Sequence, residues 1–197
     1  MRALQSQNIM PVGECLREVQ TGAKRVKLLE RDRLMEYAQR LLSMRAYTIG
    51  ELKQKLRGRA LVEADVDPVL SVLKQAGVLN DRQFADSFAV ARKSNQGFGQ
   101  ARVLRDLMVK KVPSTVAKEA VREAYSESNE LDLIAKYLER KYRGKDLKVF
   151  LGEEKNLASA YRRLRTAGYS SSNSIKVLKR FASRADEIEE DETFEVS

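Results

Sequence analysis

Hydrophobic residues recur at helical spacing from about residue 32 to about residue 185. The pattern begins after Asp32, where Leu34, Ala38 and Leu41 fall on one face of a helix. Comparable stripes return along the rest of this region. The pattern therefore predicts a chain built from α-helices.

Start and stop signals divide the first part of the pattern into three short helices. Thr48 and Glu51 have the spacing of a capping box, in which each side chain accepts a hydrogen bond from the other residue's backbone. Asp67 stands before Pro68, which predicts a capping carboxylate followed by a proline in the first helical turn. Gly77 can supply the left-handed residue that ends a helix.

The same triplet of helices then recurs. At a shift of 47 residues, Ala38, Leu41 and Arg45 match Ala85, Phe88 and Arg92. A third copy is weaker, beginning at Ala135, Leu138 and Tyr142, and its first link, around residues 143–156, is longer. Units of this length bury little alone and are stabilised by stacking on their neighbours. Three short helices with tight turns resemble helix-turn-helix modules more than the two longer helices of a HEAT repeat.

The sequence thus predicts an all-α protein with about nine helices in three tandem three-helix repeats, arranged as an elongated, curved array. The expected parts are a flexible N-terminal arm (1–31), repeat 1 (32–80), repeat 2 (81–127), repeat 3 (128–185) and an acidic, disordered tail (186–197). The residues expected to be buried within the repeats are Leu52, Leu56, Leu73, Phe84, Val103, Leu107 and Leu164.

The residues needed for most enzyme chemistry are scarce. The chain has no His and one Cys, which excludes His-based metal sites, the usual zinc thiolate sets and nucleophile–His pairs. No phosphate-cradling G-x-x-x-x-G-K-[ST] sequence occurs, and Gly97-Phe98-Gly99 is interpreted as a turn that begins a helix. Capping explains the acidic cluster Glu63, Asp65 and Asp67 adequately. We therefore expect no catalytic residue, metal, cofactor or small-molecule substrate.

Neither a secretory signal nor a membrane span is predicted. The first twenty residues contain no unbroken apolar stretch of signal-peptide length, and no run approaches the roughly 18 apolar residues of a membrane span. Cys15 cannot form an internal disulfide, and we interpret it as incidental. A cytoplasmic protein is the simplest interpretation.

Charge is distributed unevenly. The net charge of the chain is +9, but residues 186–197 hold seven acids and no Lys or Arg, so residues 1–185 carry 37 bases against 21 acids. A body this basic attracts polyanions or acidic protein grooves. The tail is either a solvated end or an internal competitor that weakens non-specific binding.

Basic residues gather on the middle helix of the second repeat and throughout the third. The partner- or DNA-binding candidates are Arg92, Arg102, Arg105, Lys110, Lys111, Arg140, Lys141, Arg143, Arg162, Arg163 and Arg165. The alternative is that each is an ordinary solvent-facing helix residue. Tyr142, Tyr161 and Tyr169 lie among these bases, where they either stack on nucleotides or pack in the core.

A string of residues between 69 and 112 resembles the signature of the RecX family. It contains Gly77-Val78-Leu79-Asn80-Asp81-x-x-Phe84-Ala85, followed by Gly99-x-x-Arg102-Val103-x-x-x-Leu107-x-x-Lys110. The resemblance covers roughly residues 34–180. Lys111 and Val112 depart from it, because the family tends to place Gly and Ile there.

This resemblance implies a non-enzymatic regulator of the RecA recombinase. RecX-like proteins bind in the groove of RecA–DNA filaments and restrain strand exchange, ATP hydrolysis and repressor cleavage, which links them to DNA repair and the SOS response. The implied partners are RecA and its nucleoprotein filament, with DNA binding plausible and no membrane partner. The alternative is a direct DNA-binding protein that places helix-turn-helix units in the major groove.

Overall fold

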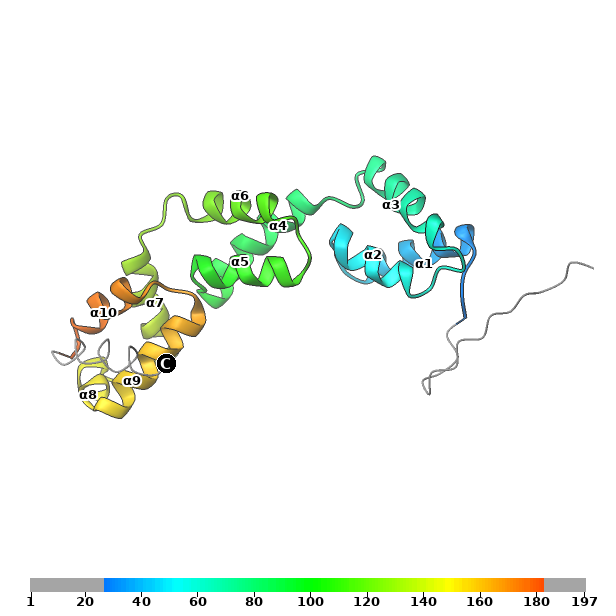
Figure 1. Ribbon diagram of the computed structural model, residues 1–197. Helices are drawn as coiled ribbons and strands as arrows, with labels where there is room; N and C mark the ends of the chain where they lie inside the picture. The colour runs from blue at the N-terminus through cyan, green and yellow to red at the C-terminus, as the bar shows by residue number, and fades with distance from the viewer. Residues whose placement is uncertain (1–26, 183–197) are drawn as a thin grey trace, which may run out of the picture.

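The structure, a computed structural model, describes residues 27–182 of the chain, and this part is helical (Figure 1). Its elements are α1 (Arg31–Met44), α2 (Ile49–Arg57), the short 3₁₀ helix η1 (Glu63–Asp65), α3 (Val66–Gln75), α4 (Asp81–Ala91), the π-helical turn η2 (Arg92–Gln96), α5 (Gln100–Val109), α6 (Ser114–Tyr125), α7 (Glu130–Lys141), α8 (Leu147–Gly152), α9 (Glu154–Ala167) and α10 (Ser171–Leu178). Within this range the only β-type pairing is an isolated parallel bridge between Leu29 and Ala60. The all-α fold predicted from the sequence is confirmed. The expected arm and tail lie mostly or wholly outside the described residues.

The helices form an elongated arch that contains three successive hydrophobic cores (Figure 1). The first core lies among α1–α3, the second among α4–α6 and the third among α7–α10. We call these helix groups unit one, unit two and unit three, and we propose that they are the three repeats. Each core is small, so the units depend on contacts with one another as well as on their own burial.

Two of the three signals read from unit one, the capping box and the closing glycine, act as predicted. The Thr48 hydroxyl accepts a hydrogen bond from the Glu51 N–H at 3.0 Å, and the Glu51 carboxylate accepts one from the Thr48 N–H at 3.4 Å. This capping box begins α2. Gly77, at φ 70°, ends α3 in the left-handed conformation.

The sequence predicted that Asp67 caps α3, and this prediction was wrong. The helix begins at Val66, two residues before Pro68, and Asp65 precedes it without a side-chain capping bond. Asp67 lies in the first turn, where its carboxylate forms a 2.6 Å ion pair with Lys53 of α2. A negative charge in the first turn interacts favourably with the helix dipole, so Asp67 stabilises α3 without capping it.

Phe84 is only partly buried, which corrects its assignment to the core. It packs at the edge of the second core, and its ring stacks on Phe88 at a centroid distance of 5.9 Å. The other residues expected to be buried are buried. Ala85, one position further on, takes the core position because α4 is rotated to bring its small residues against α6.

Unit three contains four α-helices rather than three, so ten α-helices are present in residues 27–182 instead of about nine. The additional helix, α8, lies in the long link predicted from the sequence. Asp146 begins it by accepting hydrogen bonds from the N–H groups of Lys148 and Val149. Leu151 of α8 is fully buried, so the link contributes to the third core.

The first joint, between units one and two, is made of polar and backbone contacts. The start of α2 meets the end of α5 and the start of α4. The Thr48 hydroxyl donates to the Lys110 carbonyl at 2.5 Å, and the Ile49 N–H donates to the Asp81 carboxylate at 2.7 Å. Lys111 lies so close that a Cβ added at Gly50 would collide with it.

The second joint, between units two and three, combines backbone hydrogen bonds with apolar packing. The Gly99 N–H donates to the Ala167 carbonyl at 2.8 Å, and the Tyr169 hydroxyl donates to the Gly97 carbonyl at 2.6 Å. Phe98 packs against both the second and the third cores, which makes the apolar interior continuous across this joint.

Candidate partner-binding surface

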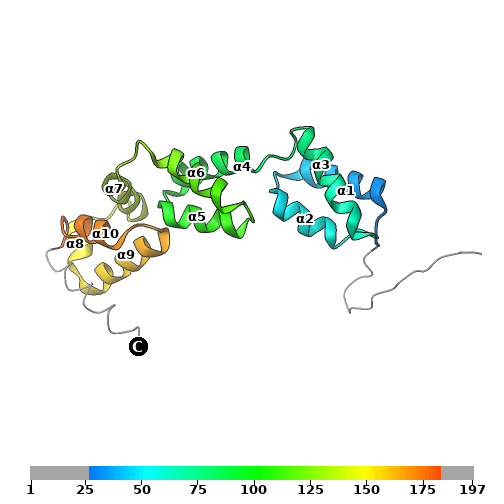
Figure 2. The same ribbon diagram turned by 45° about the horizontal axis from the view of Figure 1, so that its top comes forward.

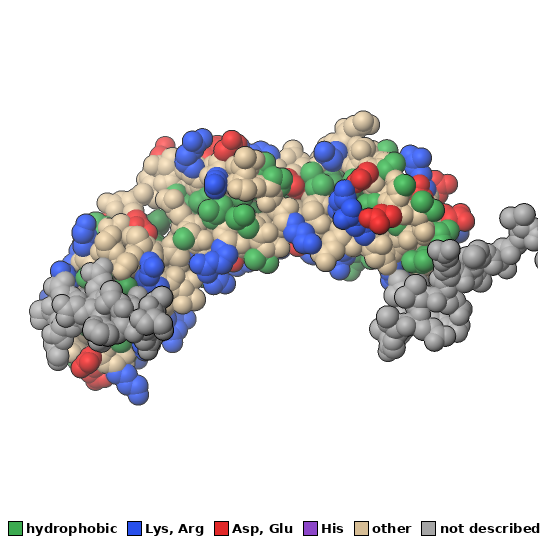
Figure 3. Space-filling view, in the orientation of Figure 1, with side chains coloured by type: hydrophobic (Ala, Val, Ile, Leu, Met, Phe, Trp, Pro, Cys, Tyr) green, Lys and Arg blue, Asp and Glu red, His purple; other side chains and the backbone are tan. Residues whose placement is uncertain are grey.

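The middle helices of the three units, α2, α5 and α9, lie along one edge of the molecule, and this edge is concave (Figures 1 and 2). Lys and Arg side chains gather along it, most densely over α5 and toward α9 (Figure 3). The order of helices within each unit explains the arrangement, because stacking equivalent units places equivalent helices side by side. The edge is therefore the candidate surface for a large or extended partner.

Five of the predicted cations are engaged within the fold. Arg92 lies over the rings of Phe88 and Phe98 and 3.9 Å from Asp106. Arg102 forms a 3.0 Å hydrogen bond with the same Asp106 carboxylate and donates to the Thr166 carbonyl across the second joint at 3.4 Å. Arg102 therefore bridges units two and three, whereas Arg92 is held within unit two.

Lys110 lies at the first joint and is partly buried. Its Nζ is 3.4 Å from the Glu51 carboxylate and lies over the rings of Phe84 and Phe88. A lysine held by a carboxylate and two aromatic rings is less available to an external anion than a solvated one.

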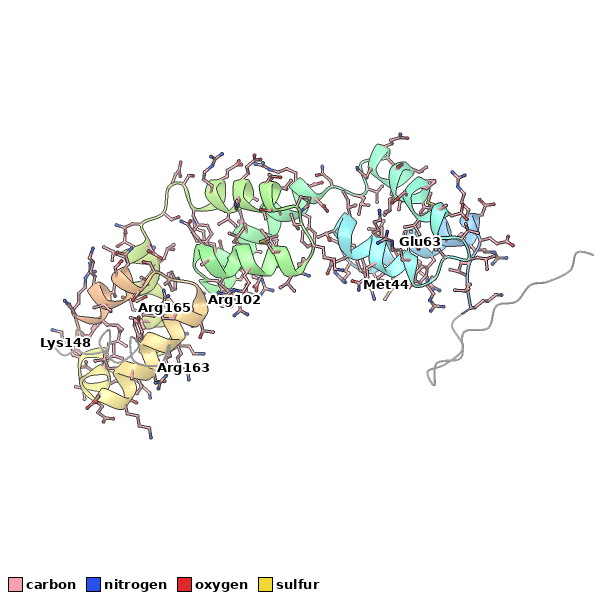
Figure 4. The ribbon with its side chains drawn as sticks, viewed as in Figure 1. Met44, Glu63, Arg102, Lys148, Arg163 and Arg165 are labelled. Carbon is pink, nitrogen blue, oxygen red and sulfur yellow. The ribbon has the colours of Figure 1, made fainter. Side chains whose placement is uncertain are left out.

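Arg140 and Arg165 donate to backbone carbonyls. Arg140 binds the carbonyls of Asn95, at 3.0 Å, and Gln96, both in the π-helical turn η2. Arg165 donates to the Tyr169 carbonyl at 2.7 Å. Figure 4 shows Arg165 close to Arg102, where α9 meets α5. These contacts assign both arginines a part in the architecture.

The other six predicted cations are exposed, and within residues 27–182 their side chains form no hydrogen bond or ion pair. They are Arg105, Lys111, Lys141, Arg143, Arg162 and Arg163. Arg163, two residues before Arg165 on α9, lies farther from α5 (Figure 4). Sequence reasoning left out Lys55 of α2 and Lys155 of α9, which are also exposed on the middle helices. Their positions on the middle helices of the repeats could have identified both lysines as candidates from the sequence.

The tyrosines among the bases differ in burial. Tyr161 and Tyr169 are buried in the third core, so the core alternative holds for both and neither presents a ring to a nucleotide. Burial raises the pKa of Tyr169 above its ordinary value. Tyr142 is partly buried and packs against Phe150 at a centroid distance of 4.9 Å.

The acidic cluster before α3 has structural partners. Glu63 pairs with Arg57 at 3.0 Å, and Asp67 pairs with Lys53. The hydrogen bond from Lys53 lowers the pKa of Asp67, whereas a general acid requires a raised one. Across residues 27–182, no cluster of His, Cys, Asp and Glu has the arrangement of a metal site. The same range contains no helix long and apolar enough to span a bilayer.

Known proteins identify the family. No family model matches the chain. A RecX regulatory protein from Vibrio parahaemolyticus is 31% identical over 135 residues, which cover 68% of this chain and 83% of that protein. One from Trichlorobacter lovleyi is 28% identical over 134 residues, or 68% of this chain and 86% of the relative. One from Amycolatopsis mediterranei is 36% identical over 90 residues, but the match spans only 51% of its length.

Solved structures agree on the fold. The crystal structure of RecX from Lactobacillus salivarius superposes with a TM-score of 0.60 at 18% identity, covering 77% of this chain and 96% of that one. A second crystal structure of a RecX regulatory protein superposes with a TM-score of 0.57 at 20% identity, covering 75% of this chain and 70% of that one. The chain belongs to the RecX family of regulatory proteins.

Proposed function

We propose that this protein is a non-enzymatic regulator that binds RecA and RecA–DNA filaments and inhibits their recombinase, ATPase and co-protease activities. In that role it modulates DNA repair and the SOS response in the cytoplasm. Membership of the family supports the assignment, because RecX-like proteins act on RecA. The observation that carries it in this chain is the cationic concave edge.

The edge has the geometry for an extended partner. Three middle helices from three units present it, so one molecule can contact successive parts of a repeating filament. Arg105 of α5 and Arg162 and Arg163 of α9 are exposed on the middle helices, and among residues 27–182 their side chains form no hydrogen bond or ion pair. Unpaired cations along one edge attract acidic protein surfaces and phosphates, and they increase the rate of encounter.

Direct DNA binding through helix-turn-helix units is the alternative, and the surface of α6 argues against it. In unit two α6 follows α5 as a recognition helix would. Its outer face carries Glu119 and Glu123, which pair with Arg82 at 2.8 and 2.5 Å. These two acids balance the exposed Lys118 and Arg122 of the same helix, so α6 lacks the excess of positive charge that contacts with DNA phosphates require.

The test compares binding to RecA–single-stranded DNA filaments with binding to bare single-stranded DNA at matched ionic strength. We expect filament binding to be tighter, with strand exchange and ATP hydrolysis inhibited. Charge reversal at Arg162 and Arg163 should weaken filament binding about tenfold. A matched reversal at Lys118 and Arg122, exposed on α6 away from the concave edge, should change it less than about twofold.

Two results would contradict the proposal. Equal affinity for bare DNA and filaments would favour the DNA-binding alternative. Equal losses from both pairs of reversals would remove the concave edge from the interface, because the effect would then depend on net charge alone.

A further inference from the structure

α5 has two apolar faces. Val103 and Leu107 on one face are fully buried in the second core. On the opposite face Ala101, Leu104, Arg105, Met108 and Val109 line a shallow, open groove. Met108 is 49% exposed and Val109 is 76% exposed. A surface helix normally presents polar side chains away from its core, so this second apolar face requires an explanation.

The charge around the groove is positive. Arg105 is its only charged lining residue, and this exposed guanidinium forms no hydrogen bond or ion pair with any residue in the range 27–182. The only acid on α5 is Asp106, which is neutralised by Arg102 at 3.0 Å with Arg92 nearby. Lys111, just beyond the end of α5, is exposed and likewise unpaired within the described part. An occupant that carries a carboxylate beside apolar side chains is complementary.

Nucleic acid is a poor occupant of this groove. Nucleotides bind through phosphate contacts to cations and through stacking of bases on aromatic rings. The lining offers one cation and no aromatic ring. Burying Met108 and Val109 against an apolar protein surface is favourable, and methionine adapts readily to the shape of a partner.

We propose that the α5 groove docks an apolar protein segment bearing an acidic side chain, with Met108 and Val109 covered and Arg105 paired to the carboxylate. The inference rests on the proposed function, in which that segment belongs to a RecA protomer of the filament. It places an apolar docking patch with one cation, Arg105, on the α5 part of the cationic concave edge.

The deciding variant is Met108→Gln with Val109→Gln. Met108 is half exposed and Val109 largely exposed, glutamine favours helices, and the net charge is unchanged, so the fold should be preserved. The matched control is Val72→Gln with Val90→Gln, which alters two exposed valines on α3 and α4. Dissociation constants for RecA–single-stranded DNA filaments and for bare single-stranded DNA are measured by fluorescence anisotropy, with circular dichroism melts confirming the fold.

We expect the groove variant to bind filaments about tenfold more weakly, with bare-DNA binding unchanged and the control variant like wild type. Arg105→Gln should give a smaller loss on filaments. Full filament binding by the groove variant would overturn this inference alone. Wild-type protein that fails to bind filaments would overturn the proposed function and, with it, this inference.

Three further results would assign the groove another occupant and so overturn the proposal. An equal loss on bare DNA would indicate nucleic acid. A change in sedimentation of the variant in the absence of partner would indicate a second copy of the chain. If both proteins are truncated after residue 185 and the groove variant then binds filaments as tightly as the wild type, the occupant would be the acidic C-terminal segment.

Discussion

The two joints hold neighbouring units together by different means. At the first joint the start of α2 contacts the end of α5 through hydrogen bonds, and no hydrophobic residue packs against both cores among residues 27–182. At the second joint Phe98 and Leu133 pack against both cores, and backbones approach closely at Gly99 and Gly168. Hydrogen bonds exchange with water at little net cost, whereas apolar contact does not. We therefore expect the first joint to open more readily than the second.

The largest expected effect is at the second joint. Gly168 has φ 91°, and a Cβ added there would collide with the backbone of Arg102. Gly168→Ala should therefore lower the free energy of unfolding by about 3 kcal/mol, from left-handed strain and overpacking together. Gly144, at φ 83°, has nothing within 4 Å of an added Cβ, so Gly144→Ala should cost only about 1 kcal/mol. Urea denaturation measures both, and equal costs would show that the close approach is unimportant.

A smaller loss is expected at the first joint. Thr48 is fully buried, and its hydroxyl both caps α2 and binds the Lys110 carbonyl. Thr48→Val keeps the shape but removes both bonds, which should cost about 2 kcal/mol. Thr48→Ser keeps the hydroxyl and should lose less than about 1 kcal/mol. If the valine variant were as damaging as Gly168→Ala, the two joints would not differ as we propose.

One substitution should stabilise the first joint. Lys111 has φ 62° and ends α5 in the left-handed conformation that Gly77 adopts after α3. Lys111→Gly should raise the free energy of unfolding by about 1 kcal/mol by relieving this strain. The reciprocal change, Gly77→Lys, should lower it by a similar amount. A thermal melt in which both variants moved the same way would contradict the strain argument.

The smallest effects are expected from pH, with opposite signs near the two joints. Burial raises the pKa of Asp81 at the first joint, against the opposing effects of the Ile49 N–H bond and Lys74. A raised folded-state pKa means that this contribution to stability is present below the ordinary aspartate pKa of about 4 and is lost as pH rises through the folded value. Asp81→Asn should therefore gain stability relative to wild type as pH rises from about 4.

Glu130, beside the second joint, should behave in the opposite way. Burial alone would raise its pKa, but hydrogen bonds from Ser170 and Asn173, with Arg165 nearby, bring the pKa below its ordinary value. Its contribution is present above the ordinary glutamate pKa and is lost as pH falls through the lowered folded value. Glu130→Gln should thus approach wild-type stability in acid. Denaturation curves at several pH values test both residues, and parallel profiles would contradict the assignment.

Two local signals in the sequence predicted the structure correctly, whereas the third, the Asp67 cap, did not. The capping box of Thr48 and Glu51 and the closing Gly77 depend on residues within one turn of helix, so their spacing is informative. Sequence reasoning was wrong about Phe84, because the apolar stripe of α4 does not reveal how far the helix is rotated against α6. The long link before α9 was predicted, but not its helix.

The cations could not be sorted from the sequence. Arg140 and Arg163 lie in equally basic surroundings, yet Arg140 binds the carbonyl of Asn95, 45 positions away, and Arg163 is exposed. Lys110 is held by Glu51 through a contact that spans 59 positions. Such pairings depend on how units stack, and periodicity within one unit carries no information about them. The roles proposed for the exposed cations stay predictions.

Two backbone amide groups allow the opening of each joint to be measured separately in solution. The Ile49 N–H is the first of α2 and its hydrogen bond goes to Asp81 in unit two, while the Gly99 N–H precedes α5 and binds Ala167 in unit three. Neither bond belongs to a helix of its own unit. Hydrogen–deuterium exchange at these positions therefore reports the separation of units without the unwinding of a helix. Faster exchange at Ile49 than at Gly99 would mean that unit one moves relative to units two and three, which move as one body. The proposed filament could then be bound first by one end of the molecule and afterwards by the other.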